Sequence, residues 1–126
     1  MSNASFSSNI VAVVQNRGTE FSLEGLTLGL LTVCPSPEGI RGVELVAEGY
    51  ARQAIEFEPR SDRAHVRNCG HLVFGPMADG SPQPMFAAIY DRDGAVVGYG
   101  RLFRSAGNSN PNCFEFSVQA ITFQIN

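Results

Sequence analysis

The side chains best suited to bind a metal ion lie in one short segment. His65, Cys69 and His71 are close together in the sequence, and the other two cysteines are far from them. A zinc site needs three or four such side chains at one point, usually as closely spaced pairs, and this spacing matches none of the usual ligand patterns. We therefore predict no metal site and interpret the segment as a polar loop that enters a strand at Leu72.

The same segment could supply a thiol nucleophile and its base. Cys69 and His71 are two residues apart, so on a strand they would share a face. A reactive thiol also needs an accessible, electropositive pocket, and this segment is a short loop at both ends. Phosphate-binding glycine loops and the Gly-x-Ser-x-Gly turn are absent from the sequence. We predict a non-enzymatic protein without a cofactor, and a thiol enzyme is the least favoured alternative.

Cysteine usage also bears on the redox environment. Cys34, Cys69 and Cys113 are odd in number and widely spaced. Small domains stabilised by disulfides usually carry an even number of cysteines. We expect buried, unreactive thiols in a reducing cytosol.

Asp91 and Asp93 could act as a paired acid and base, or as part of a calcium site. The segment Asp91–Gly94 instead has the composition of a tight turn, because Asp and Gly both favour chain reversal. Apolar runs flank it at Phe86–Tyr90 and Ala95–Tyr99. We predict a β-hairpin here.

The most distinctive polar stretch is Gly49–Gln53. Tyr50 combines a large ring with a hydroxyl group, and Arg52 carries a planar donor fork suited to carboxylates or carbonyls. We predict that Tyr50, Arg52 and Gln53 form an interface with a partner. The alternative is local: Tyr50 closes a corner of the fold, and Arg52 pairs with a nearby Glu.

Length and charge limit the class of protein. The chain has 126 residues, of which 44% are hydrophobic, and a formal net charge of -3. This predicts one globular domain over residues 1–126. All nine basic residues are Arg and are scattered among acids, so nucleic-acid binding is not expected. The start of the chain lacks a signal-peptide pattern, and no apolar run approaches the roughly 18 residues of a membrane span.

The apolar spacing predicts the elements that must position these side chains. Residues Phe6–Gln15 have helical spacing, with Gly18 where a helix would end, and predict a short N-terminal helix. A strand is the alternative over Ile10–Val14, because this run is mostly β-branched. Alternating or short apolar runs predict strands near residues 26–30, 55–58, 72–74, 86–90, 95–99, 114–118 and 121–125. With 13 Gly and 7 Pro in the turns, they indicate a mainly β fold, an antiparallel sandwich or jelly-roll-like small barrel with a short N-terminal helix.

A series of short motifs extends over nearly the whole chain. The motifs are Arg17–Phe21, Leu26–Leu30, Glu48–Gln53, Val73–Pro76, Ala88–Asp91, Gly98–Gly100 and Ile121–Ile125. In this order and spacing the chain resembles a family of small virion proteins of tailed bacteriophages, described as tail-fibre-like, decoration or minor structural proteins. The resemblance implies a β-rich virion component, made in the host cytoplasm, that self-associates and binds the major capsid protein or other virion proteins.

The position within the virion follows from chain architecture. A fibre normally contains repeats or a coiled-coil shaft, and this chain has neither. We therefore predict a capsid decoration or cement protein that binds the assembled head lattice and stabilises it by linkage. A trimer is expected, because head lattices offer local threefold positions. The alternative is a tail-fibre or baseplate module that binds a receptor or glycan, with Tyr50, Tyr90 and Tyr99 as stacking residues.

Overall fold

The computed structural model describes residues 10–16, 22–33, 42–58, 65–104 and 113–125. Within these ranges the chain forms strands and no helix, which confirms the prediction of a mainly β protein. The strands are β1 (Ile10–Asn16), β2 (Thr27–Val33), β3 (Val43–Glu44), β4 (Gln53–Ala54), β5 (Phe57–Glu58), β6 (His65–Asn68), β7 (Leu72–Phe74), β8 (Phe86–Tyr90), β9 (Val96–Arg104), β10 (Phe114–Phe116) and β11 (Ile121–Gln124).

One nine-stranded sheet dominates the structure. Its strand order is β3-β2-β8-β9-β1-β11-β6-β5, and β4 pairs with β2 beside β3. Neighbouring strands are antiparallel except β1 and β11, which run parallel with Ala12 opposite Ile121. The prediction of an antiparallel arrangement is therefore wrong at this pair. Parallel neighbours need a long connection, and nearly the whole chain lies between these two strands.

Strand β1 occupies residues 10–15 of the predicted N-terminal helix, so the helix prediction is wrong over that range. Its side chains alternate between buried and exposed, and it is hydrogen-bonded to β9 on one side and β11 on the other. β-Branched side chains pack well on a pleated surface, and pairing on both sides outweighs the helical spacing of the apolar residues. Residues 6–9 of the predicted helix lie outside the described residues.

Strands β3 and β4 share one edge of β2. β3 pairs with β2 at Leu31 and Val33, whereas β4 pairs with it at Thr27 and Leu28. Residues 45–52, called here the 45–52 loop, leave the edge after β3 and return to it at β4. β3 and β4 are therefore one edge strand with a loop inserted.

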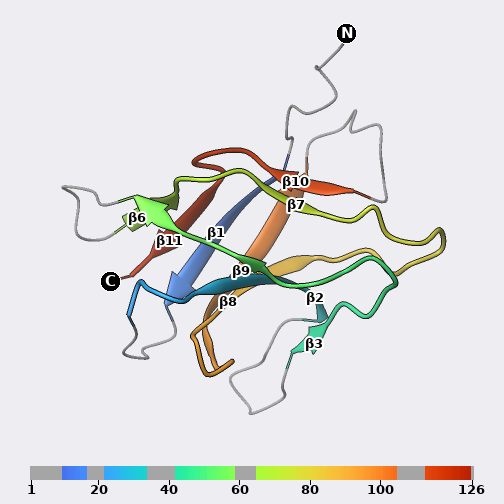
Figure 1. Ribbon diagram of the computed structural model, residues 1–126, viewed down its shortest axis with the longest axis horizontal. Coiled ribbons are helices and arrows are strands. Elements are labelled where there is room, and N and C mark those ends of the chain that lie inside the picture. The colour runs from blue at the N-terminus through green and yellow to red at the C-terminus, as the bar shows by residue number, and fades with distance from the viewer. Residues whose placement is uncertain (1–9, 17–21, 34–41, 59–64, 105–112, 126) are drawn as a thin grey trace, which may run out of the picture.

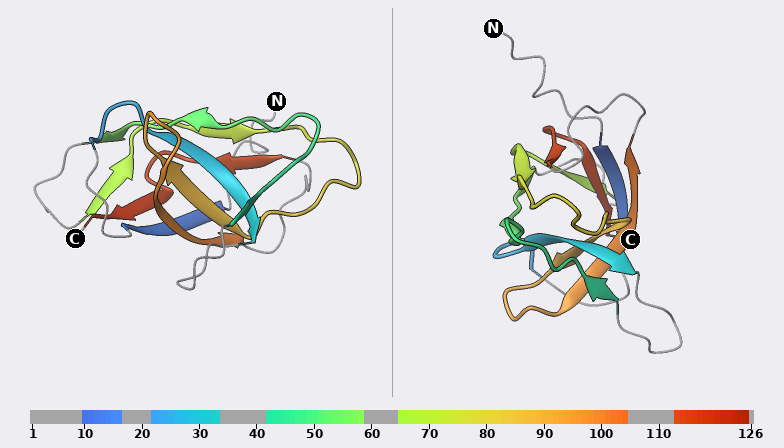
Figure 2. Two further views of the ribbon diagram at one scale, coloured as in Figure 1. Left: turned by 90° about the horizontal axis from the view of Figure 1, so that it is seen from below. Right: turned by 90° about the vertical axis from the view of Figure 1, so that its right-hand side faces the viewer.

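The two ends of the large sheet are linked by the segment that follows this edge strand. β4 continues into β5, and β5 pairs with β6 at the far end of the strand order. The Ile55 N–H donates to the Leu26 carbonyl at 3.1 Å, and the Cys69 N–H donates to the Glu56 carbonyl at 2.9 Å. The sheet consequently curls round on itself, as Figure 2 shows.

The main core lies between the curled sheet and a two-stranded sheet of β7 and β10. These two strands lie side by side across one face of the larger sheet (Figure 1). Their Phe74 and Phe116 rings meet edge to face, with 5.9 Å between centroids. Phe57 and Phe123 form a second ring contact at 5.6 Å.

A smaller apolar cluster lies on the opposite face of β2, β8 and β9. In β8, Ala87 and Ile89 enter the main core, whereas Ala88 and Tyr90 enter this second cluster. The second cluster comprises buried Leu31, Ala88 and Tyr90 and partly buried Phe86, Val96 and Tyr99. β2 and β8 are therefore buried on both faces, which explains why they read as nearly continuous apolar runs.

The predicted hairpin is confirmed. β8 and β9 pair antiparallel across the turn Asp91–Gly94. One carboxylate oxygen of Asp91 accepts hydrogen bonds from the N–H groups of Asp93 and Ala95, each at 2.9 Å. The Asp91 carboxylate therefore forms the turn, in the way that Asx turns do.

Most of the other predicted strands are also present, at β2, β5, β7, β10 and β11. Three short strands, β3, β4 and β6, were not predicted from the sequence. β3 and β4 have two residues each, and β6 (His65–Asn68) alternates one apolar side chain with polar neighbours. None of these runs is long or apolar enough to predict a strand.

Asn68 is a buried polar residue that joins three parts of the chain. Its side-chain oxygen accepts from the Ile121 N–H at 2.8 Å. Its amide nitrogen donates to the carbonyls of Gly70 and Ser117, at 2.7 and 3.0 Å. Because every hydrogen bond is made within the protein, the amide can be buried at the point where β6 meets β11.

Replacing Asn68 with alanine should lower the free energy of unfolding by about 2 kcal/mol, because the buried Ile121 N–H loses its acceptor. Urea denaturation followed by circular dichroism measures the change. The control is Val118→Ala, whose side chain is exposed and whose effect should stay within about 0.5 kcal/mol. Equal stability of Asn68→Ala and the wild type would contradict this role.

Candidate functional site

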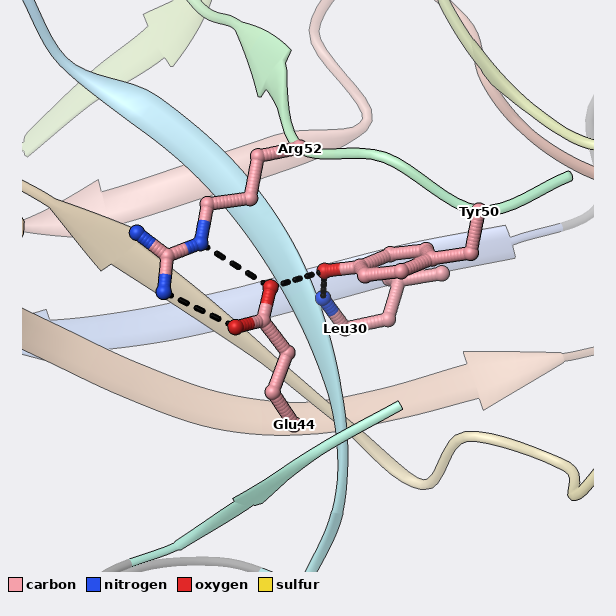
Figure 3. Close-up of polar contacts among 4 residues, drawn as sticks. All are labelled: Leu30, Glu44, Tyr50 and Arg52. Carbon is pink, nitrogen blue, oxygen red and sulfur yellow. Dashed lines mark hydrogen bonds and ion pairs between the residues drawn. The ribbon is translucent and has the colours of Figure 1, made fainter. Parts of the chain in front are cut away.

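The hydroxyl of Tyr50 fills the break between β3 and β4. At this break the Leu30 carbonyl accepts from the Leu45 N–H at 2.9 Å. The Leu30 N–H points to the same edge and donates to the Tyr50 hydroxyl at 3.0 Å (Figure 3). A side-chain oxygen thus takes the place of the backbone carbonyl that an uninterrupted edge strand would supply.

Glu44 and Arg52 complete this arrangement from the two sides of the 45–52 loop. The Tyr50 hydroxyl donates to Oε2 of Glu44. Arg52 donates from Nε to the same oxygen at 2.9 Å and from Nη2 to Oε1 at 2.8 Å (Figure 3). This is the bidentate geometry that favours arginine over lysine. We call Leu30 N–H, Glu44, Tyr50 and Arg52 the edge brace.

The edge brace packs against the second apolar cluster at Tyr90. The guanidinium carbon of Arg52 lies 3.6 Å from the centroid of the Tyr90 ring, a cation–π contact. The space for this packing exists because residue 29 is glycine. A Cβ at Gly29 would lie 2.8 Å from a ring carbon of Tyr90 and 2.9 Å from the Tyr50 hydroxyl oxygen.

The 45–52 loop is fixed at its far end by backbone contacts. The Glu48 carbonyl accepts from the Ala78 N–H at 3.1 Å. Gly49 has a φ of +95°, and a Cβ there would lie 2.3 Å from the Pro76 carbonyl oxygen. Tyr50 stacks on Phe74 with 6.2 Å between centroids. Glycine at position 49 is therefore required both for the backbone conformation and for the close approach.

The electrostatics of the edge brace favour the ionised carboxylate and the protonated phenol. The hydrogen bond from Arg52 lowers the pKa of Glu44, and burial only partly offsets this. Burial raises the pKa of Tyr50 well above its ordinary value, and the hydrogen bond to Glu44 raises it further. Tyr50 is therefore a proton donor at neutral pH, and the group is arranged to hold its geometry rather than to exchange protons.

The structure brings together two of the three residues predicted to form an interface. Tyr50 and Arg52 meet through Glu44, whereas Gln53 lies in β4 and donates its amide to the Ala51 carbonyl at 3.3 Å. The local alternative for Arg52, pairing with a nearby Glu, is confirmed. An interface role for the three residues stays a prediction.

Glu44 and the packing role of Gly29 were not predicted from the sequence. Glu44 and Arg52 lie eight positions apart, on either side of a loop. No local spacing rule links them, because the loop returns to the same edge of β2 only in the folded chain. Gly29 sits within an apolar run, and the absence of a side chain between Leu28 and Leu30 is the only signal that something packs against it.

Of the predicted polar loop with His65, Cys69 and His71, only residues 69–71 form a connection before β7, because His65 is the first residue of β6. Cys69 and His71 follow the end of β6, so they do not share a strand face. Cys69 is exposed, with its thiol 3.5 Å from the Glu56 carbonyl oxygen, so the expectation of a buried thiol is wrong there. Cys113 is half-buried, and Cys34 lies outside the described residues. In the described ranges no three His, Cys, Asp or Glu side chains are grouped to hold a metal ion.

An apolar pocket of about 260 Å³ lies beside β1, β9 and β10. It is lined by Ile10, Gln83, Pro84, Met85, Leu102 and Phe114. This lining contains one amide and no acid, base or thiol, so the pocket could hold an apolar group but has no side chain suited to catalysis.

The tyrosines considered for glycan stacking do not form one open platform. The Tyr50 ring is stacked on Phe74, and the Tyr90 ring is buried beneath Arg52. Tyr99 is partly buried in the second cluster. Two of the three rings therefore have a face covered by the protein itself.

Comparisons of the chain with protein-family models, with curated proteins and with solved structures gave no match. In the part of the chain that the structure describes, no helix has the length and apolar character needed to cross a membrane.

Gly29→Ala should destabilise the fold by about 1–3 kcal/mol, because the new methyl group would overlap Tyr90 and Tyr50. Thermal and urea unfolding measure the loss. Gly70→Ala is the matched control, since nothing lies within 4 Å of a Cβ there. A Gly29→Ala protein as stable as Gly70→Ala would show that the edge brace tolerates displacement.

The lowered pKa of Glu44 predicts a response to acid. At pH values above 4.5, the ordinary pKa of Glu, the ionised Glu44 carboxylate stabilises the fold. This stabilisation is lost as the pH falls through the lower pKa that Glu44 has in the folded protein. Arg52→Gln should raise the pKa of Glu44, as measured by NMR titration of its carboxyl carbon. As the pH falls below 4.5, the free energy of unfolding should decrease less for Glu44→Gln than for the wild type. An unchanged Glu44 midpoint in Arg52→Gln would contradict the assignment.

Proposed function

We propose that this protein is a non-enzymatic structural component of a bacteriophage virion, and in particular a decoration or cement protein of the head. The observation that carries the proposal is an apolar surface on the outer face of β1 and β9. This outer patch consists of Val11, Val13 and Phe103, whose side chains are 46%, 39% and 53% exposed. Neighbouring exposed apolar side chains of this kind are typical of surfaces that bind other proteins.

The outer patch is contiguous because of the strand register. Val11 and Val13 alternate with the buried residues of β1, so both face outward. Val11 lies directly opposite Phe103 across the β1–β9 pair. Both strands lie in the interior of the strand order, with hydrogen-bonded neighbours on each side. A surface that is ordered before binding loses little conformational entropy when a partner docks.

Other properties of the described residues fit a binding role. The polar groups of the edge brace are paired with one another, and the apolar pocket carries no reactive group. The curled sheet whose ends are linked through β4 and β5 supports a jelly-roll-like small barrel. The motif order described above supports the virion assignment. The partners would be the major capsid protein and further copies of the chain, with a trimer at the threefold positions of the lattice.

Binding to the assembled shell would stabilise it through linkage, because the protein would bind the assembled lattice and not its free subunits. Shells that lack the protein should release their contents at a lower temperature than shells saturated with it. The measurement is a thermal release assay on shells prepared without the protein and then reconstituted. Identical release curves with and without bound protein would contradict a cementing role.

The outer patch predicts which residues make the contact. The double variant Val11→Ser/Phe103→Ser should bind shells at least about tenfold more weakly, since burial of each apolar side chain contributes about 1.5–3 kcal/mol. Co-sedimentation with shells measures the affinity. Val118→Ser, equally exposed on another part of the surface, should bind like the wild type. Wild-type affinity of the double variant would place the contact elsewhere.

A further inference from the structure

The free side of β3 is an open sheet edge. β3 stands at the end of the strand order, with β2 on one side and no strand on the other among the described residues. We infer that this edge pairs with the same edge of a second copy of the chain, by antiparallel strand addition about a two-fold axis. Unpaired edges present a row of backbone donors and acceptors that another strand can bind.

The register of β3 shows which backbone groups are available. Glu44 lies opposite Leu31, and the hydrogen bond between Leu45 N–H and the Leu30 carbonyl flanks this pair. Glu44 is therefore in a non-hydrogen-bonded position, and its own N–H and C=O point away from β2. Two such edges related by a two-fold axis at Glu44 would exchange both N–H···O=C bonds. The same residue supplies donor and acceptor, so the edge is complementary to itself.

The side chains at this edge are apolar and exposed. Val43 is 50% exposed and pairs with Val33, which is 47% exposed. Val46, just beyond β3, is 83% exposed. In the two-fold arrangement, Val43 of one copy lies opposite Leu45 of the other. Leu45 is buried in the main core, so Val43 supplies the exposed apolar surface at this pair.

Charge decides whether two copies can meet in this register. The two-fold axis places the Glu44 side chains of the two copies directly opposite each other, and like charges in that position are destabilising. Arg52 already binds each carboxylate with two hydrogen bonds, at 2.8 and 2.9 Å. The edge brace therefore neutralises the Glu44 charge, which would oppose self-pairing in this register.

The pairing is weak in free solution because β3 has two residues. A contact of this length buries less than the roughly 1,200–2,000 Å² of a stable interface. The same contact would form readily between copies bound side by side on a surface, because such neighbours have a high effective concentration. The pairing itself depends on the β3 edge and the edge brace, and its action on a shell rests on the proposed function.

Sedimentation velocity at protein concentrations up to about 1 mM tests the pairing. The wild type should associate with rising concentration. Val43→Lys should weaken association at least about tenfold with unchanged unfolding free energy, because a lysine on an edge strand opposes strand addition. Val118→Lys is the control and should associate like the wild type. Absence of concentration-dependent association in the wild type, or wild-type association of Val43→Lys, would overturn the proposal.

A rescue experiment separates charge neutralisation from simple bracing. Arg52→Gln should weaken association at least about tenfold, because two unpaired carboxylates would then face each other. The double variant Glu44→Gln/Arg52→Gln lacks both charges and should recover most of the association. A double variant as weak as Arg52→Gln alone would contradict the two-fold register. Val11→Ser/Phe103→Ser should still associate, so failure of shell binding and failure of edge pairing are distinguishable.

Discussion

The N–H of Leu30, which faces the break in the edge strand, is the constraint around which this edge of the protein is built. Its strand is buried on both faces, and the edge strand beside it is interrupted by the 45–52 loop. A buried N–H without an acceptor is costly, so the loop must return an oxygen to that point. Tyr50 supplies it. Gly49 allows the loop to turn beside Pro76, and Gly29 leaves room for the ring's hydroxyl and for Tyr90.

The edge brace links that local requirement to the surface of the molecule. Glu44 belongs to β3 and Arg52 precedes β4, so their ion pair holds the two halves of the interrupted strand in register. The pair itself is partly exposed, with side-chain exposures of 37% for Arg52 and 27% for Glu44, and such pairs contribute little to stability alone. Its main effect is geometric: it fixes the edge that we propose for self-association and removes the charge that would oppose it.

Sequence patterns predicted the parts of the fold that depend on local information. The hairpin at Asp91–Gly94 and the alternating strands β10 and β11 were predictable from turn chemistry and from the two-residue period. β1 was predicted as a helix because its apolar spacing satisfies both periods, and only its pairing with β9 and β11 decides between them. The pairing of Arg52 with a Glu was an alternative from the sequence, but the identity of Glu44 depends on where the loop returns.

Hydrogen exchange at the Leu30 amide tests most directly whether Tyr50 seals the break in the edge strand. In the wild type the Leu30 N–H should exchange as slowly as that of Leu28, which lies opposite β4 on the same strand. In Tyr50→Phe the Leu30 amide should exchange much faster while Leu28 remains protected. Equal protection of Leu30 in the two proteins would contradict the account, because the amide would then have another acceptor.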